Sequence, residues 1–230
     1  ENGLLSFSLD TNNPDIDSVK INFESQELDF ANNIKIGGIY ANPTFKVTAT
    51  DGNHIKSVSL VVEGVEESYP FVKSGEEASG EELWEVTIDT TETTDKTDKT
   101  DKKIENGTKT FEIRVEDMAG RITTSTKTLL VDNQTPSISV ESHIPNEQVT
   151  GTVRISGTTS DGDKGSGIES VKWLIAKKSE IEGKSSDEIV ALDGWTDVNG
   201  KDAWNYTFSG DGELGNYVKL GTNQNKDVSE

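Results

Sequence analysis

The residues best suited to binding a metal ion lie in one glycine-rich segment, Asp161-Gly-Asp163-Lys-Gly165. Two carboxylates separated by one residue can converge on a hard cation such as Ca2+, which takes about six to eight oxygen ligands. The third aspartate and the distant glutamate of a complete calcium loop are missing, and Lys164 opposes cation binding. The segment therefore has two interpretations, a structural turn or a Ca2+ site formed by Asp161 and Asp163. We interpret Asp51-Gly-Asn53 and Asp211-Gly-Glu213 as turns at an end of a sandwich, with a metal site as the less favoured alternative for each.

Trp195 is the aromatic residue whose position favours contact with a ligand. It follows Asp193-Gly194 and, unlike Trp84 and Trp204, has no counterpart in the other half of the chain. An indole ring in such a loop either stacks on a sugar or folds back over the edge of its own domain, and both interpretations stay open.

Residues for acid–base or nucleophilic catalysis are scarce. Cysteine is absent, and the two histidines, His54 and His143, lie in different halves of the chain. The sequence has no Gly-x-Ser-x-Gly, His-Glu-x-x-His or phosphate-binding loop. A pair of carboxylates acting as in a glycosidase stays open, although abundant acidic residues are more simply explained as solvated surface groups. We expect a protein that is not an enzyme and has no cofactor, with Ca2+ as the one candidate exception.

The charge balance excludes two classes of partner. Asp and Glu number 42 against 22 Lys and Arg, so the formal net charge is -20. Nucleic acids and anionic membrane surfaces are bound by clustered positive charge, so we expect neither as a partner. The sequence also contains no run of about 18 apolar residues, the length needed to span a bilayer. Because only 31% of the residues are hydrophobic, the core must be thin, which favours two layers of β-sheet.

The elements that must position these residues are predicted to be strands. Apolar residues alternate with polar ones in residues 5–9, 45–49, 111–115 and 153–157, and this period of two is typical of a strand with one buried face. The only helical pattern is a weak one at residues 180–192. The predicted fold class is therefore all-β.

Four sequence blocks recur in the same order, which indicates tandem modules. The matched blocks are residues 10–14 with 132–136, 45–49 with 153–157, 55–60 with 168–173, and 84–88 with 204–208. This alignment pairs Val47 with Ile155 and Ala49 with Gly157. The first and last residues of the opening block are Asp and Pro in both copies, and proline interrupts a β-ladder and so suits a junction.

The repeat predicts three parts. Residues 1–13 are the last strand of an upstream module plus a junction, residues 14–134 are the first β-sandwich, and residues 135–230 are a second one that lacks its last strand. The polar repeats in residues 90–107 predict a disordered loop. We expect the spare strand at residues 4–9 to pair with an open edge near residues 217–220, or with the first module.

Several of these segments resemble bacterial immunoglobulin-like repeats. They are Ser166-Gly-Ile-Glu-Ser-Val171-Lys-Trp, Trp204-Asn-Tyr-Thr-Phe208 and Arg114-Val-Glu-Asp117-Met-Ala-Gly120-Arg121, the last with Arg121 where the family usually has Asn. The resemblance implies tandem Ig-like β-sandwiches on the bacterial cell surface, in an extracellular setting. It also implies neighbouring Ig-like modules of the same polypeptide as partners, together with a host or glycan ligand.

Two functional hypotheses follow. The first is a non-enzymatic pair of modules that serves as a stalk, spacer or adhesive region of a bacterial surface protein. The second is a carbohydrate-binding accessory region of a secreted polysaccharide-active enzyme. The acidic surface and an aromatic content of only 7% favour the first.

Overall fold

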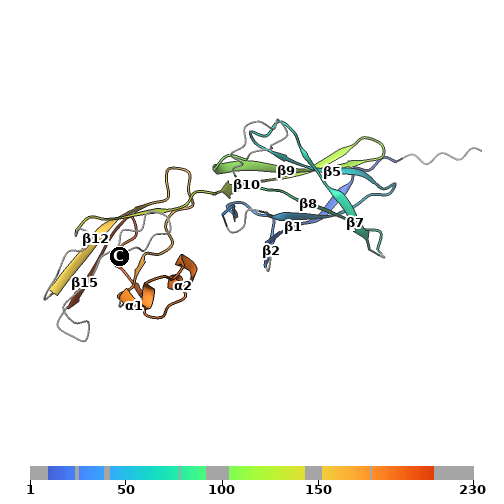
Figure 1. Ribbon diagram of the computed structural model, residues 1–230. Helices are drawn as coiled ribbons and strands as arrows, with labels where there is room; N and C mark the ends of the chain where they lie inside the picture. The colour runs from blue at the N-terminus through green and yellow to red at the C-terminus, as the bar shows by residue number, and fades with distance from the viewer. Residues whose placement is uncertain are drawn as a thin grey trace, which may run out of the picture. The chain divides into compact units, whose positions relative to one another are not determined.

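The computed structural model describes residues 10–23, 26–38, 42–77, 79–91, 104–142, 152–176 and 178–209. The chain divides into two compact units (Figure 1). Unit 1 comprises Glu1–Gln134 with Lys164–Ser166, and unit 2 comprises Thr135–Asp163 with Gly167–Glu230. In the described residues the only helices are α1 (Lys178–Ile181) and α2 (Ser186–Val190), and all other regular elements are strands. The prediction of an all-β fold is confirmed.

Unit 1 is a sandwich of two five-stranded sheets. One sheet has the order β2 (Gln26–Asp29), β1 (Asp15–Phe23), β4 (Thr44–Thr50), β8 (Glu82–Thr87) and β7 (Val72–Glu76). The other has the order β3 (Lys35–Ile36), β10 (Ile122–Val131), β9 (Gly107–Asp117), β5 (Ile55–Val62) and β6 (Tyr69–Pro70). Neighbouring strands are antiparallel except for the parallel pair β3 and β10.

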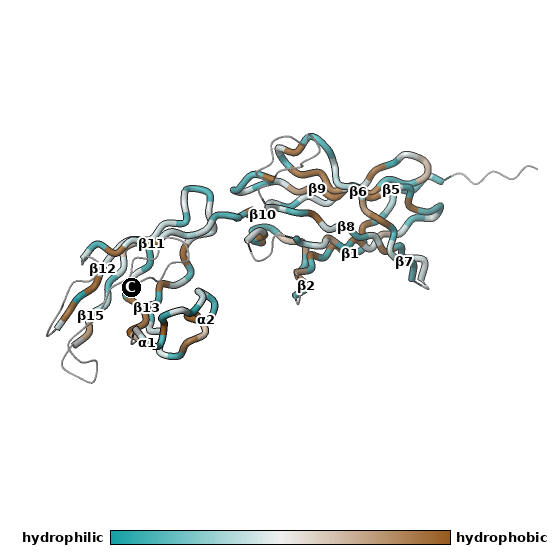
Figure 2. Tube along the Cα trace, viewed as in Figure 1, coloured by the Kyte–Doolittle hydropathy of each residue, from teal (hydrophilic) through white to brown (hydrophobic). Residues whose placement is uncertain are grey.

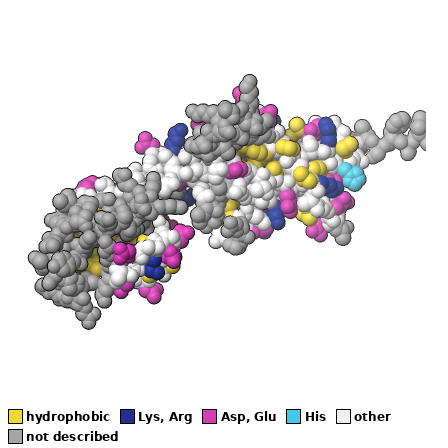
Figure 3. Space-filling view, in the orientation of Figure 1, with side chains coloured by type: hydrophobic (Ala, Val, Ile, Leu, Met, Phe, Trp, Pro, Cys, Tyr) yellow, Lys and Arg dark blue, Asp and Glu magenta, His cyan; other side chains and the backbone are white. Residues whose placement is uncertain are grey.

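The core of unit 1 follows directly from the alternation of its strands, and Figure 2 shows hydrophobic residues recurring along them. In β4, Phe45, Val47 and Ala49 are almost completely buried, whereas the residues between them are only partly covered. Phe45 stacks on Phe111 of β9 with ring centroids 6.0 Å apart, and Phe30 packs edge-to-face against Phe45 with ring centroids 6.1 Å apart. These three rings join the two sheets. On the surface, acidic side chains are spread among basic and neutral ones (Figure 3).

Unit 2 has a smaller core. Its three-stranded sheet has the order β11 (Ser137–Val140), β12 (Thr152–Ser160) and β15 (Ala203–Ser209), and a second sheet pairs β13 (Lys172–Trp173) with β14 (Thr196–Asp197). The buried hydrophobic residues at its centre are Val153, Ile155, Val171 and Trp204.

The two short helices of unit 2 lie between β13 and β14, where the weak helical pattern was noted. The side chain of Ser185 accepts a hydrogen bond from the backbone of Glu188, whose own side chain accepts one from the Ser185 backbone. Such a capping box stabilises the start of a short helix.

One strand order occurs in both units, and the pairing of these strands shifts the alignment of the matched blocks by two residues. The order β1, β4, β8 recurs as β11, β12, β15. Trp84 lies opposite Val47, and the matching Trp204 lies opposite Gly157. Val47 therefore corresponds to Gly157, and not to Ile155. A shift of two residues keeps every side chain on its own face of the sheet, so an alternating pattern alone cannot detect it. The corrected alignment also places Asp161 at the position of Asp51.

Some predictions lie partly or wholly outside the described residues. These are the spare strand at residues 4–9, the open edge near residues 217–220 and most of the predicted loop at residues 90–107. The described ends of that loop belong to the core of unit 1, because Thr90 and Ile104 are fully buried.

Candidate functional site: a carboxylate cluster at one end of unit 1

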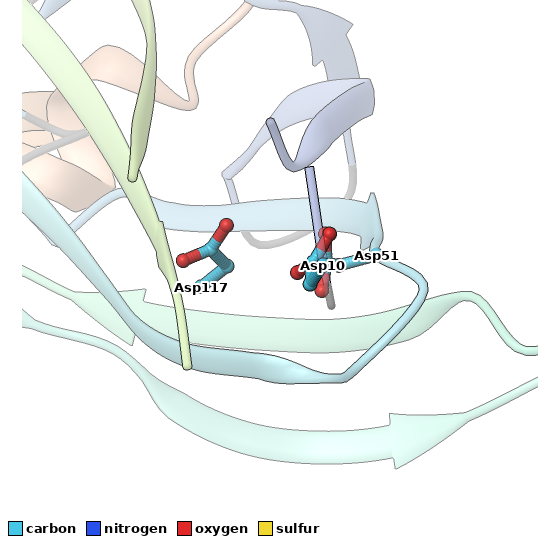
Figure 4. A group of neighbouring side chains, drawn as sticks. All are labelled: Asp10, Asp51 and Asp117. Atoms are coloured by element: carbon cyan, nitrogen blue, oxygen red, sulfur yellow. The ribbon is translucent and has the colours of Figure 1, made fainter. Parts of the chain in front are cut away.

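Three aspartates from distant parts of the chain meet at one end of unit 1 (Figure 4). Asp10 precedes β1, Asp51 follows β4, and Asp117 is the last residue of β9. One carboxylate oxygen from each lies within 4.8 Å of the other two. Each aspartate flanks or ends a strand at the same end of the sandwich, and this shared placement brings them together.

Local turns hold each carboxylate in place. Asp10 accepts a hydrogen bond from the backbone N–H of Asn12 at 3.1 Å, and Asp51 accepts one from Asn53 at 2.9 Å. Asp117 Oδ1 accepts two, from the N–H groups of Ala119 and Arg121. Aspartate commonly forms such turns with the backbone two residues further on.

The side chain of Arg121 joins two of the three aspartates. Its Nη2 lies 2.5 Å from Asp10 Oδ2, and its Nε lies 2.9 Å from Asp117 Oδ2. The side chain of Asp117 is fully buried, and that of Asp10 is only 10% exposed. The guanidinium therefore ties the segment that precedes β1 to the turn between β9 and β10.

These contacts shift the pKa values of Asp10, Asp117 and Arg121. The hydrogen bond from the Arg121 side chain is the main cause that lowers the pKa of Asp10. Burial acts to raise the pKa of Asp117, but hydrogen bonds from Arg121 and Ala119 outweigh burial, and the pKa is lowered. The hydrogen bond to Asp10 is the main cause that raises the pKa of Arg121. Charged forms are thus favoured throughout this network.

The cluster has oxygen ligands but poor acid–base properties. Three carboxylates with one guanidinium leave a formal excess of two negative charges. Asp51 Oδ1 is buried and accepts no hydrogen bond, whereas Asp10 Oδ2 is paired with the guanidinium of Arg121. A carboxyl group with a lowered pKa is deprotonated at neutral pH and has no proton to donate, so Asp10 and Asp117 are unsuited to general acid catalysis.

The residues singled out from the sequence lie elsewhere. Asp161 is buried and its Oδ2 accepts a hydrogen bond from the backbone N–H of Gly167 at 2.7 Å, whereas Asp163 is exposed. Neither belongs to the described group of three acidic residues that could hold a metal. Ca2+ binding at Asp161 and Asp163 stays a prediction.

Trp195 lies beside α2 in the insert of unit 2. The ring is partly buried, and its Nε1 lies 3.4 Å from the carbonyl oxygen of Ile189, to which it donates a hydrogen bond. In unit 1, His54 contacts the buried Glu82 through Nδ1 at 3.2 Å. His143 lies outside the described residues.

The carboxylate cluster is not predicted by the sequence. There, Asp10 is a junction residue, Asp51 is part of a turn and Asp117 is part of a pattern that resembles a family. The available signal was positional, since Asp51 directly follows β4, Asp117 ends β9 and Asp10 lies in the segment before β1.

Comparisons with known proteins give structural neighbours only. No family model matches the chain, and a search of curated proteins finds no match. Among solved structures, dimeric latent PorU from Porphyromonas gingivalis is 14% identical with a TM-score of 0.38, and the match covers 91% of this chain and 18% of that one. The fibronectin(III)-like modules of CbhA from Clostridium thermocellum are 14% identical with a TM-score of 0.31, covering 82% and 77%.

A third neighbour is the N-terminal Ig1-2 module of the Drosophila receptor protein tyrosine phosphatase DLAR. It is 12% identical with a TM-score of 0.31, and the match covers 86% of this chain and 97% of that one. The chain thus spans less than a fifth of the length of PorU. Across the described residues, no helix has the length and apolar character needed to cross a membrane.

Proposed function

We propose that the chain is a non-catalytic pair of Ig-like modules that acts as a stalk, spacer or adhesive region of a longer, extracellular bacterial surface protein. The observation that carries this proposal is the recurrence of one strand order, β1–β4–β8 and β11–β12–β15. Repeated modules of one design, joined end to end, extend a protein without requiring a ligand.

The junction residues support the same role. Asp10 and Asp132 begin the two Asp-x-x-x-Pro blocks, and each accepts a hydrogen bond from the backbone two residues further on, at 3.1 and 3.0 Å. In unit 1, Asp132 also accepts one from Ser166 at 2.6 Å. Both blocks therefore use the same turn, and each tethers the chain at a boundary between strands.

A polysaccharide pull-down distinguishes the spacer from the carbohydrate-binding hypothesis. We expect the full chain to stay in solution when mixed with insoluble glucans, xylans or chitin, because Trp195 is partly covered and hydrogen-bonded to α2. A Trp195→Ala variant serves as the control. Retention of the parent chain that is lost in this variant would establish carbohydrate binding and overturn the spacer proposal.

For the Asp161 segment we propose a structural turn, with Ca2+ binding as the alternative. Asp161 is the acceptor for the N–H of Gly167, so Asp161→Ala should lower the free energy of unfolding of unit 2 by about 1–3 kcal/mol. The exposed Asp163 should tolerate Asp163→Ala. A urea titration in which hydrogen exchange of the β12 amides is the readout measures the effect of each substitution on the stability of unit 2.

Calcium is tested on the same variants. A structural turn predicts that millimolar CaCl2 leaves the stability of unit 2 unchanged. A ligand that binds only the folded state would raise it by mass action. A rise in the parent chain that disappears in Asp163→Ala would establish the Ca2+ site.

A further inference from the structure

We propose that Arg121 is a built-in cation: its guanidinium takes the place that a divalent metal ion would fill among Asp10, Asp51 and Asp117, so that the attachment of the segment before β1 needs no metal. The inference concerns how unit 1 is held together. It applies whether the module serves as a spacer or binds a ligand.

The first argument is the geometry of the contacts. Arg121 reaches two carboxylates that belong to different segments, Asp10 at 2.5 Å and Asp117 at 2.9 Å. A metal ion bound by these aspartates would join the same two segments. A planar guanidinium can do this because its N–H groups point in fixed, different directions.

The second argument is the charge balance. Three carboxylates within 4.8 Å of one another repel, and the ion pairs of Asp10 and Asp117 recorded in the described residues are all with Arg121. Without this side chain, three carboxylates would face one another, and another cation would be needed to neutralise their negative charge. Asp51 Oδ1, buried and without a hydrogen bond, would be available as a further ligand.

The third argument is that backbone hydrogen bonds alone hold Arg121 next to the cluster, independently of its side-chain contacts. The backbone N–H of Arg121 donates to Asp117 Oδ1 at 2.9 Å, and its carbonyl accepts from the N–H of Asp117 at 3.0 Å. Gly120, with a φ of 84°, closes this turn. The side chain therefore starts next to the cluster, and only its own rotamers have to be fixed for it to reach the carboxylates.

The test compares three full-length proteins, the parent chain, Arg121→Gln and Arg114→Gln, each in EDTA and in millimolar CaCl2. Arg114 is a matched control, because it lies on the exposed side of β9 and pairs with Glu112 on the same strand. Hydrogen–deuterium exchange of peptides from β9 and β10 reports unit 1 alone, so any effect of Ca2+ on unit 2 is read separately.

For the parent chain and Arg114→Gln we expect the same protection with and without Ca2+. Arg121→Gln should lower the unfolding temperature of unit 1 by about 5–10 °C in EDTA. CaCl2 should restore most of this loss, because the three carboxylates are then free to bind the ion. Adding Asp51→Asn to Arg121→Gln should abolish the restoration.

Two outcomes would overturn the proposal. One is stabilisation of unit 1 by Ca2+ in the parent chain, and the other is an Arg121→Gln variant that folds but gains no response to Ca2+. Should Arg121→Gln fail to fold in EDTA, calorimetric titration of the parent chain with CaCl2 decides the question. Binding that is lost in Asp51→Asn contradicts a built-in cation, and no binding at the cluster supports it.

Discussion

Phe45→Ala should lower the free energy of unfolding of unit 1 by about 3–5 kcal/mol, the usual cost of removing a large aromatic side chain from a packed core. Phe45 has no exposed surface and lies between the rings of Phe111 and Phe30. Its removal would leave a cavity where the two sheets meet. Because neighbouring side chains refill such a space only partly, the loss exceeds the transfer free energy of the ring alone.

Hydrogen exchange on the full chain measures this loss. Amides in the centre of β9 open only when unit 1 unfolds, so their protection should fall by roughly 100-fold to a few thousand-fold, since about 1.4 kcal/mol corresponds to a factor of ten. Val72→Ala is the control, because Val72 on the edge strand β7 is 72% exposed. A decrease of less than tenfold in β9 would mean that Phe45 does not join the two sheets.

Much of unit 1 could be predicted because its strands have one buried face. The alternation at residues 45–49 and 111–115 identified β4 and β9 and chose Phe45 and Phe111 as inward residues. Phe30, which completes the aromatic cluster, follows the short exposed strand β2. Nothing in an exposed four-residue strand signals that the next side chain enters the core.

The carboxylate cluster could not be predicted because it depends on three chain segments that only the fold brings together. Asp10 and Asp117 are 107 positions apart in the sequence, and no local pattern encodes their contact. The sequence did show that Arg121 stands where an Asn is usual in the resembling family. That departure became interpretable only when the structure placed the guanidinium among the aspartates.

The alignment of the repeats shows a different limit. Hydrophobic alternation determines which face of β12 is buried, but it repeats every two residues. A match of Ala49 to Gly157 therefore looked as good as the true match of Val47 to Gly157. Hydrogen-bonded partners on the neighbouring strands are needed to choose between the two.

Gly157 is the position in unit 2 where a side chain should have the largest effect. A Cβ atom there would lie 1.8 Å from the carbonyl oxygen of Ser139 on β11 and 2.7 Å from Cζ2 of Trp204 on β15. In unit 1 the same position holds Val47 opposite Trp84. In unit 2, the ring of Trp204, which is only 4% exposed, fills the space that a side chain at position 157 would need.

We therefore expect Gly157→Val to abolish the order of β11, β12 and β15. Both clashes cannot be relieved together, because moving β11 away breaks its ladder with β12 and turning Trp204 out removes the largest side chain of a small core. Amides of β12 should then exchange at the rate of an unfolded chain, while those of β9 keep their protection because unit 1 has its own core. Thr207→Val, an exposed change on β15, is the control and should leave both units intact. Retained protection of β12 in Gly157→Val would show that Trp204 does not fill this space, and equal loss in β9 would show that the two units do not unfold independently.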